Sequence, residues 1–420
     1  MLDRSIAPDF VTTKHVDFQS PEKIQLAGGL PVFLFNGGKQ AVTRIEIVFP
    51  AGRWFEPSPG IAHFTAKVLA EGSKSFNTRQ IAEILDINGA HLETVSGFDY
   101  ATITLHCLSD KLDTVLPVLI DILNYPTFPV NELEKQKDIY KQNLAINLEK
   151  NGYVSGKLIR EKLFGLNNPY GRDLGIDEIQ QLTAEELNNN YLNNYIQPKV
   201  FIAGLLNKDQ EDILFNSLEQ IEFRNINKVN NNYHKLDVSE RVLIDKVQSI
   251  QTSVRLAAHS VNRENPDYFN LLIFNQIFGG YFGSRLMKNI REEKGLTYGI
   301  HSAVHTLRNG SYFSVNAEVN KQNRELVIDE IYKEREAISI SLIPQNEFKA
   351  AINNFIGSIQ SEMSTIFAHA DKFKVIELNG LDTNHNQKLI EFAAGITSTQ
   401  LNDFINRYIK TLRFQEVIVG

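Results

Sequence analysis

The five residues His63-Phe64-Thr65-Ala66-Lys67 stand where a helix could bind a metal ion. An H-x-x-E-H segment places two imidazoles on one helix face to hold Zn²⁺, and its Glu activates a water. Here His63 is present, but Ala66 replaces the Glu and Lys67 replaces the second His. A catalytic zinc site needs three protein ligands and one open position. A lone imidazole beside an ammonium group cannot supply them, so we predict that this chain holds no metal.

His63 therefore has two possible roles. It can be a helix residue that is hydrogen-bonded within its own domain, or it can contact a peptide in a degenerate cleft. Lys67 lies one turn further along the same helix face, where its positive charge would repel a divalent ion.

Arg291 and Tyr298 stand seven positions apart, on either side of a glycine. Arg291 falls in the last turn of a helix predicted over 284–294, with Ser284 as its N-cap. Gly295 ends this helix, and Tyr298 lies early in the next strand. The end of a helix and the start of a strand can thus meet at one cleft. The alternatives are an ion pair of Arg291 with a local acid and a plain surface position for Tyr298.

The sequence also contains a His301-x-x-x-His305 pair. In a strand both imidazoles point to one face, while Tyr298 and Ile300 point to the other. No acidic companion is evident nearby, so we predict neither a metal site nor a part in the chemistry of Tyr298.

A glycine-rich turn precedes the predicted helix, at Gly279, Gly280 and Gly283. It lacks the spaced lysine of a phosphate-binding loop. We therefore predict a tight turn that allows Ser284 to cap the helix.

The composition is that of a globular protein with at least two domains, because 420 residues exceed the size of one ordinary core. Hydrophobic residues make up 42% and charged residues 22% of the chain. A net charge of −7 and a pI near 5.9 argue against nucleic acids and anionic membranes as partners. The single cysteine, Cys107, excludes an intrachain disulfide and is predicted to be a core residue of a strand.

No stretch is long and apolar enough to cross a membrane. The N-terminal residues Met1–Pro8 show neither the apolar segment nor the cleavage pattern of a secretion signal. We predict a cytoplasmic protein, with the periplasm as the alternative if a signal has been removed.

The chain repeats itself in two halves. Residues 182–204 and 396–420 each contain a helix capped by Thr183 or Thr397, a polar turn and a short apolar strand that ends on glycine. The halves are joined by an Asn-rich, polar segment, so we predict domains at 1–221 and 241–420 with a linker at 222–240.

Upstream of these closing strands the halves agree in pattern. The first half has a strand at 42–50, the helix with His63, a helix ending at Gly89, and strands near 90–96 and 98–108. The second half has the corresponding elements, which are a strand at 251–259, helices at 266–278 and 284–294, and strands near 296–306 and 310–319. This order predicts an α+β fold in which each half is an antiparallel sheet with helices packed on one face.

At this point the chain resembles the pitrilysin/insulinase family of inverzincin metallopeptidases, in the short form related to mitochondrial processing peptidase. The resemblance covers nearly the whole chain. It is carried by EIVFPAGRWFEPSPGIAHFTAKVLAEGSKSF (46–76), QSIQTSVRLAA (248–258) and IFNQIFGGYFGSRLMKNIREEKGLTYGI (273–300). The family's third zinc ligand, a Glu, would align with Asn143 or Leu144, and neither is a carboxylate.

The resemblance implies a function for Arg291 and Tyr298. Tyr298 would donate its hydroxyl to the scissile carbonyl, and Arg291 would hold a backbone carbonyl of the substrate. It implies that the chain is the zinc-deficient subunit of a heterodimeric zinc endopeptidase, whose homologous partner binds the zinc and whose substrates are unfolded peptides. The alternative is a scaffold or peptide-binding homologue without proteolytic activity. A self-sufficient hydrolase is less favoured, because the chain has no G-x-S-x-G motif.

Overall fold

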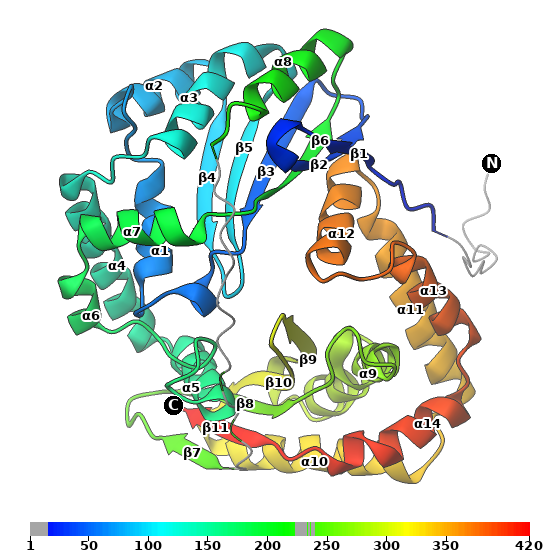
Figure 1. Ribbon diagram of the computed structural model, residues 1–420. Coiled ribbons are helices and arrows are strands. Elements are labelled where there is room, and N and C mark those ends of the chain that lie inside the picture. The colour runs from blue at the N-terminus through cyan, green and yellow to red at the C-terminus, as the bar shows by residue number, and fades with distance from the viewer. Residues whose placement is uncertain (1–15, 223–232, 234–235, 237–239) are drawn as a thin grey trace, which may run out of the picture.

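The computed structural model describes residues 16–222, 233, 236 and 240–420. Their strands form two sheets that lie at opposite ends of the molecule (Figure 1). The first sheet has the order β1-β2-β6-β3-β5-β4. Its strands are β1 (Glu22–Gln25), β2 (Pro31–Asn36), β3 (Val42–Phe49), β4 (His91–Ser96), β5 (Ala101–Leu108) and β6 (Lys199–Gly204).

The second sheet has the order β7-β11-β8-β10-β9. Its strands are β7 (Arg241–Ile244), β8 (Gln251–His259), β9 (Thr297–Leu307), β10 (Gly310–Asn320) and β11 (Gln415–Val419). Neighbouring strands are antiparallel in both sheets, except that β2 is parallel to β6 and β7 is parallel to β11. From β2 to β4 the first sheet therefore has the same strand order as the second, and β1 is an additional edge strand.

The glycines that end the two halves occupy equivalent places. A Cβ atom on Gly204 would lie 2.4 Å from the carbonyl oxygen of Val42, and one on Gly420 would lie 2.4 Å from that of Gln251. Such distances leave no room for a side chain. The repeat therefore ends on glycine because each closing strand meets the start of its neighbour at backbone contact.

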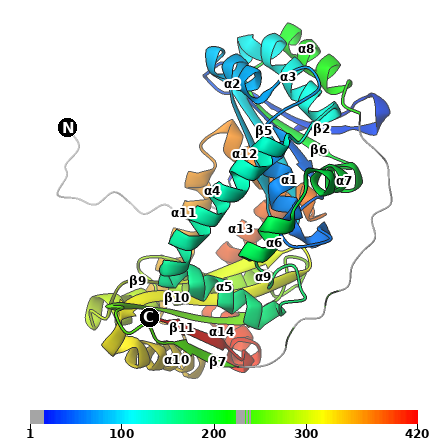
Figure 2. The same ribbon diagram turned by 90° about the vertical axis from the view of Figure 1, so that its left-hand side faces the viewer.

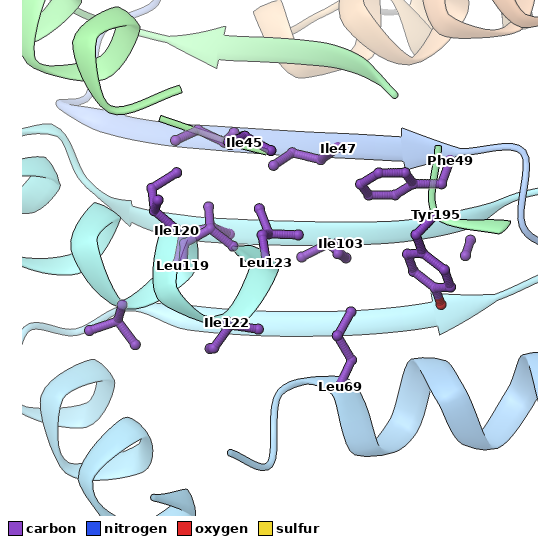
Figure 3. Packing of buried hydrophobic residues seen from close by; sticks show 14 of the residues in the cluster. Ile45, Ile47, Phe49, Leu69, Ile103, Leu119, Ile120, Ile122, Leu123 and Tyr195 are labelled. Carbon is purple, nitrogen blue, oxygen red and sulfur yellow. The ribbon is translucent and has the colours of Figure 1, made fainter. Parts of the chain in front are cut away.

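The helices of the first half lie mostly on one face of the first sheet. They are α1 (Ile61–Leu69), α2 (Thr78–Ile87), α3 (Leu112–Asn124), α4 (Val130–Glu149), α5 (Asn151–Phe164), α6 (Ile176–Gln181), α7 (Ala184–Asn194) and α8 (Lys208–Leu218). Figure 3 shows the core between this sheet and α3, where Ile45 and Ile103 from the strands meet Leu119 and Leu123 from the helix. Cys107 lies in this core, as predicted, and burial raises the pKa of its thiol to about 12.

The second half has its own helices and its own core. The helical elements of the second half are α9 (Tyr268–Asn275), the π-helical turns η4 (Gln276–Gly280) and η5 (Met287–Glu293), α10 (Arg324–Ile340), α11 (Gln345–Glu362), α12 (Ile366–Leu378), α13 (His385–Gly395) and α14 (Ser398–Arg407). As predicted, Thr183 and Thr397 cap α7 and α14, each accepting a hydrogen bond from the amide three residues later. Gly89 lies just past the end of α2 with φ +60°.

The other face of each sheet is covered by a helix from the opposite half. Helix α12 places Ile366, Ala370 and Phe373 against the first sheet, where they meet aromatic residues of β2 and β6. Helix α5 lies on β8 and β11 of the second sheet. Figure 2 shows α4 running from the first sheet toward the second, where α5 begins. Each sheet is thus covered by helices on both faces, and one of these faces is covered by the opposite half of the chain.

Ion pairs reinforce the contact of α12 with the first sheet. Arg44 of β3 pairs with Asp371, with 2.8 Å between Nη2 and Oδ1. Lys374 Nζ lies 2.7 Å from Oε1 of Glu46, a carboxylate that is buried in the sheet. These ion pairs, together with the apolar packing of α12, fix the position of this helix on the sheet.

The α+β class and the two sheets of like order confirm the predicted fold. Most of the predicted linker at 222–240 and the N-terminal residues 1–15 lie outside the described residues, so the division into domains at the linker stays a prediction. Among the described helices, none has the length and apolar character that a membrane span requires.

Candidate functional site

The helix that carries the degenerate motif, α1, is held at its N-terminus by a buried carboxylate. Oε2 of Glu56 accepts hydrogen bonds from the amides of Gly60 and Ala62, each at 3.1 Å. The carboxylate also pairs with Arg172 at 3.3 Å. Burial raises the pKa of Glu56, an effect that these hydrogen bonds and charges oppose. An acid at this end of a helix also interacts favourably with the helix dipole.

The side chains at the three motif positions on α1 have different surroundings. The ring of His63 meets Tyr140 of α4 edge to face, with centroids 5.1 Å apart. Ala66 is buried and Lys67 is exposed. Burial, and then the positive charges of Lys67 and Arg53, lower the pKa of His63 to about 4. His63 is therefore neutral at pH 7, and it packs against aromatic rings in place of the predicted hydrogen bonds.

The fourth motif position also lacks a ligand. Leu144 of α4 is 5% exposed and belongs to the core of the first half, while Asn143 points to the surface. The donor set around His63 therefore does not fit zinc. Across the described residues, no three His, Cys, Asp or Glu side chains are grouped so that they could hold a metal ion.

Arg291 and Tyr298 are presented by a helix end and a strand start. Arg291 lies in η5, which is followed by Gly295 at φ +63°, and the amide of Leu296 closes the turn on the Ile290 oxygen at 2.9 Å. The predicted glycine stop is confirmed. The guanidinium carbon of Arg291 lies 4.9 Å from the ring centroid of Phe282. This cation–π contact holds the side chain, and no carboxylate in the described part of the chain forms an ion pair with it.

A β-bulge sets the direction of Tyr298. The register of β9 with β10 shifts between Ala317 and Val319, so that Glu318 faces the bulged residues. Thr297 Oγ1 donates to the Glu318 carbonyl at 2.6 Å and accepts from the Gly299 amide at 3.1 Å. Tyr298 is 88% exposed, although Ile300, two residues on, is 1% exposed. The prediction that Tyr298 and Ile300 share a face is therefore wrong, because a bulge interrupts the alternation.

The two side chains line one pocket of about 330 Å³. Glu318 and Asn320 of β10 and Gln251 of β8 also line it. The pocket thus combines a guanidinium, a phenol, a carboxylate and two amides. Such a set can bind the backbone and one side chain of a peptide. No residue of α1 lines this pocket.

His301 and His305 belong to a hydrogen-bonded network on one face of the second sheet. Arg255 donates to Asn316 Oδ1 at 2.8 Å, so the Asn316 amide nitrogen donates to Ser314 Oγ at 3.0 Å and faces His301 Nε2 at 3.4 Å. The Ser314 hydroxyl also shares a hydrogen bond of 3.0 Å with His305 Nε2. Because an amide nitrogen can only donate, Nε2 of His301 is an acceptor and its ring carries the proton on Nδ1.

Comparison with known families matches two models in succession along the chain. Residues 32–167 match the model described as Insulinase (Peptidase family M16), and residues 181–355 match that of the peptidase M16 inactive domain. The chain belongs to peptidase family M16. Helix α1 lies within the first match, and both Arg291 and Tyr298 lie within the second.

Individual relatives and a solved structure are similar to this chain over most of its length. An uncharacterized zinc protease of Rickettsia felis is 25% identical over 333 residues, which cover 74% of this chain and 76% of the relative. The non-peptidase homolog YmxG of Helicobacter pylori is 26% identical over 369 residues, or 83% and 82% of the two chains. The crystal structure of a peptidase M16 inactive domain from Pseudomonas fluorescens has a TM-score of 0.85 at 21% identity, covering 95% of this chain and 98% of that one.

The turn before η5 in this M16 chain differs from the prediction. Ser284 is buried, and among the described residues its hydroxyl finds no hydrogen-bond partner, so it does not cap the helix. Gly279 is needed for another reason, because a Cβ atom there would lie 2.7 Å from the Ser302 amide nitrogen. The glycine therefore lets η4 approach β9 closely.

Sequence reasoning missed Glu318, which lines the pocket of this M16 chain, and Phe282, which contacts Arg291. Phe282, which stacks on Arg291, follows Tyr281 in the glycine-rich turn, where the sequence gives no sign of this contact. Glu318 faces Tyr298 only through the bulged pairing of β9 with β10. The string of residues that carries the family resemblance ends before Glu318, so no local signal could have found it.

Proposed function

We propose that this M16 chain is the zinc-deficient subunit of a two-subunit zinc endopeptidase. A homologous subunit with the complete motif would bind the zinc and supply the nucleophilic water. One observation carries the proposal: Arg291 and Tyr298 line a common pocket in a chain whose own motif positions hold no ligand set. A protein with a purely structural role has no need for these two donors in one place.

Each donor has a specific task in this proposal. The hydroxyl of Tyr298 would donate a hydrogen bond to the scissile carbonyl oxygen as negative charge develops on it. The exposure of its side chain, 88%, leaves it accessible to a second chain. Arg291, whose planar group stacks on Phe282, would donate to a backbone carbonyl of the substrate.

The substrates in this proposal are unfolded peptides. An extended peptide would add as a strand to a sheet edge in the zinc-binding domain of the partner subunit. Tyr298 and Arg291 would then close over it from this chain. The cytoplasmic location stays a prediction of the sequence.

Reconstitution tests the proposal. The partner is to be isolated by co-purification from the native host, and peptide cleavage is measured for each chain alone and for the mixture with zinc. We expect neither this chain alone nor its zinc-treated form to cleave peptides, whereas the mixture does. In the mixture, Tyr298→Phe should lower kcat/KM by roughly a hundredfold to a thousandfold.

A matched control is Tyr125→Phe, which removes an exposed hydroxyl in the first half that is bonded to Glu222 and does not line the pocket. This variant should keep full activity in the mixture. Unchanged turnover for Tyr298→Phe would contradict the assigned role of the phenol.

The second candidate is a scaffold or peptide-binding homologue without proteolytic activity. It is favoured by the similarity to the non-peptidase homolog of Helicobacter pylori and by the match to the M16 inactive domain. A stable complex with the co-purified partner that binds peptides but shows no cleavage with zinc would support this candidate.

A further inference from the structure

Another pocket, of about 360 Å³, lies where one end of the first sheet meets the second half of the chain. The first half contributes residues at the start of β2, the end of β3 and the start of β6. The second half contributes Arg308, from the turn between β9 and β10, and Leu378, the last residue of α12. None of these residues lines the Arg291–Tyr298 pocket. The inference that follows is therefore independent of the function proposed for that pocket.

Arg308 brings to this pocket a positive charge that no ion pair neutralises. Its side chain is exposed, and within residues 16–222 and 240–420 no carboxylate forms an ion pair with its guanidinium. Asp99 instead holds the backbone of the turn, since its Oδ2 accepts a hydrogen bond from the Arg308 amide at 3.0 Å. The other oxygen of this buried carboxylate accepts from the Tyr170 hydroxyl. The guanidinium is thus available to a ligand.

Two donors cover the helix end that borders the pocket. The last carbonyls of a helix carry partial negative charge, which by itself would oppose an anion. Here the Tyr100 hydroxyl donates to the Leu378 carbonyl at 2.8 Å. Lys199 Nζ donates to the carbonyl of Glu377 at 3.3 Å and to its Oε1 at 2.5 Å. An ammonium group has three N–H donors, so Lys199 keeps one for a ligand.

The phenol of Tyr100 and the guanidinium of Arg308 face each other in this pocket. Burial raises the pKa of Tyr100, and the positive charge of Arg308 opposes this rise. The charge of Lys199 is balanced by Glu377, so Arg308 supplies the one net charge that the lining offers. The polar end of the pocket is therefore cationic.

The remaining walls are apolar and rigid. Pro31, Pro50 and Pro198 line the pocket together with Val48. Proline has no N–H group that an anion could use. A ligand would therefore place its charge at the cationic end and its apolar part against the prolines.

This combination selects the chemistry of the ligand. A guanidinium binds a carboxylate through two parallel hydrogen bonds. A phosphate group would need more donors than one guanidinium and one N–H of Lys199 provide. We propose that the pocket binds a carboxylate with an apolar substituent through Arg308 and Lys199. Two sources have this chemistry, which are the C-terminal end of a peptide and a small free organic acid.

Matched acids and amides test this inference on the full-length chain. The probes are hexanoate and hexanamide, followed by calorimetry, and a tetrapeptide that ends in Leu with either a free carboxylate or an amide and carries a fluorophore at its N-terminus. We expect at least one acid to bind roughly tenfold more tightly than its amide, because a hydrogen bond to a charged group contributes about this much. The acid that binds should also raise the melting temperature.

Variants locate the effect. Arg308→Gln should remove the preference for the acid, and Arg308→Lys should keep part of it. The amide of residue 308 makes the contact with Asp99, so both substitutions leave the turn in place. The control Arg79→Gln removes a positive charge from an exposed position on α2 that does not line the pocket. It should keep the full preference.

The pattern of binding distinguishes the two sources. Binding of the peptide acid but not of hexanoate identifies a peptide C-terminus, and the reverse identifies a small free acid. Binding of both acids shows that the pocket accepts either. The inference is overturned if neither acid binds, if acid and amide bind equally well, or if Arg308→Gln retains the wild-type preference.

Discussion

The imidazole of His63 and the phenol ring of Tyr140 meet edge to face, with centroids 5.1 Å apart. This contact joins α1 to α4 at the place where the family motif would require a metal. One turn beyond Tyr140, Leu144 enters the core. The site is therefore ordinary helix packing, and we expect that no single substitution creates a zinc site here.

Repair of the motif on α1 is the first prediction. The double substitution Ala66→Glu and Lys67→His restores the H-x-x-E-H pattern, but position 144 remains Leu. Ala66 is 2% exposed, so a Glu there also strains the packing. We expect less than one zinc per chain after dialysis, measured by metal analysis, and a lowered melting temperature. Retention of one zinc per chain would show that Leu144 does not prevent binding.

The bulge at Tyr298 gives the second prediction. Thr297→Val keeps the shape of the side chain but removes its hydrogen bonds to the Glu318 carbonyl and the Gly299 amide. The loss should cost about 1–2 kcal/mol in free energy of unfolding. We also expect a lower kcat of the reconstituted complex, because the phenol loses its fixed direction. If stability falls while kcat is unchanged, the bulge does not set the position of Tyr298.

The contact of α12 with the first sheet gives the third prediction. The Phe373 ring lies 5.1 Å from that of Phe33 and 5.7 Å from that of Phe35, measured between centroids. Phe373→Ala should lower the free energy of unfolding by about 3–5 kcal/mol, because it leaves a cavity between the halves. Val375→Ala on the same helix, at a position 39% exposed, should cost well under half as much. Denaturant unfolding compares them, and equal costs would contradict the role given to this packing.

The fourth prediction concerns pH. Burial, and then Arg255, His301 and Arg160, lower the pKa of His305 from 6.5 to about 4. The unfolded chain therefore takes up a proton at this residue below about pH 6.5, whereas the folded chain does not until about pH 4. The contribution of His305 to stability is complete above the unfolded pKa and falls as pH drops toward the folded pKa.

His305→Phe tests this dependence. Phe keeps the ring stacking on Tyr312, whose centroid lies 4.3 Å from that of His305, and removes the titrating group. Denaturant midpoints measured between pH 7.5 and pH 4.5 should fall less steeply in the variant than in the wild type. Parallel pH profiles would show that the buried imidazole does not contribute.

Much of the site could be predicted because its signals are local. The identities of Ala66 and Lys67 remove the general base and one zinc ligand whatever the fold, and Gly295 stops its helix through backbone geometry alone. The direction of Tyr298 could not be predicted, because strand alternation assumes an uninterrupted pairing. The partner strand β10 supplies the bulge, and its register with β9 is a relation between residues in separate strands.

The sequence by itself determined the two-half repeat, the α+β class and the loss of the zinc ligands, because each depends on residue type and on periods within one element. Only the tertiary structure decided that α12 and α5 cover the sheets of the opposite halves, and that Glu318 faces the Arg291–Tyr298 pocket. The physical reason is that an apolar helix face or a charged side chain does not by itself specify which surface it will contact. An amphipathic helix can bury its face against either sheet, and the choice is made by the packing of the whole chain.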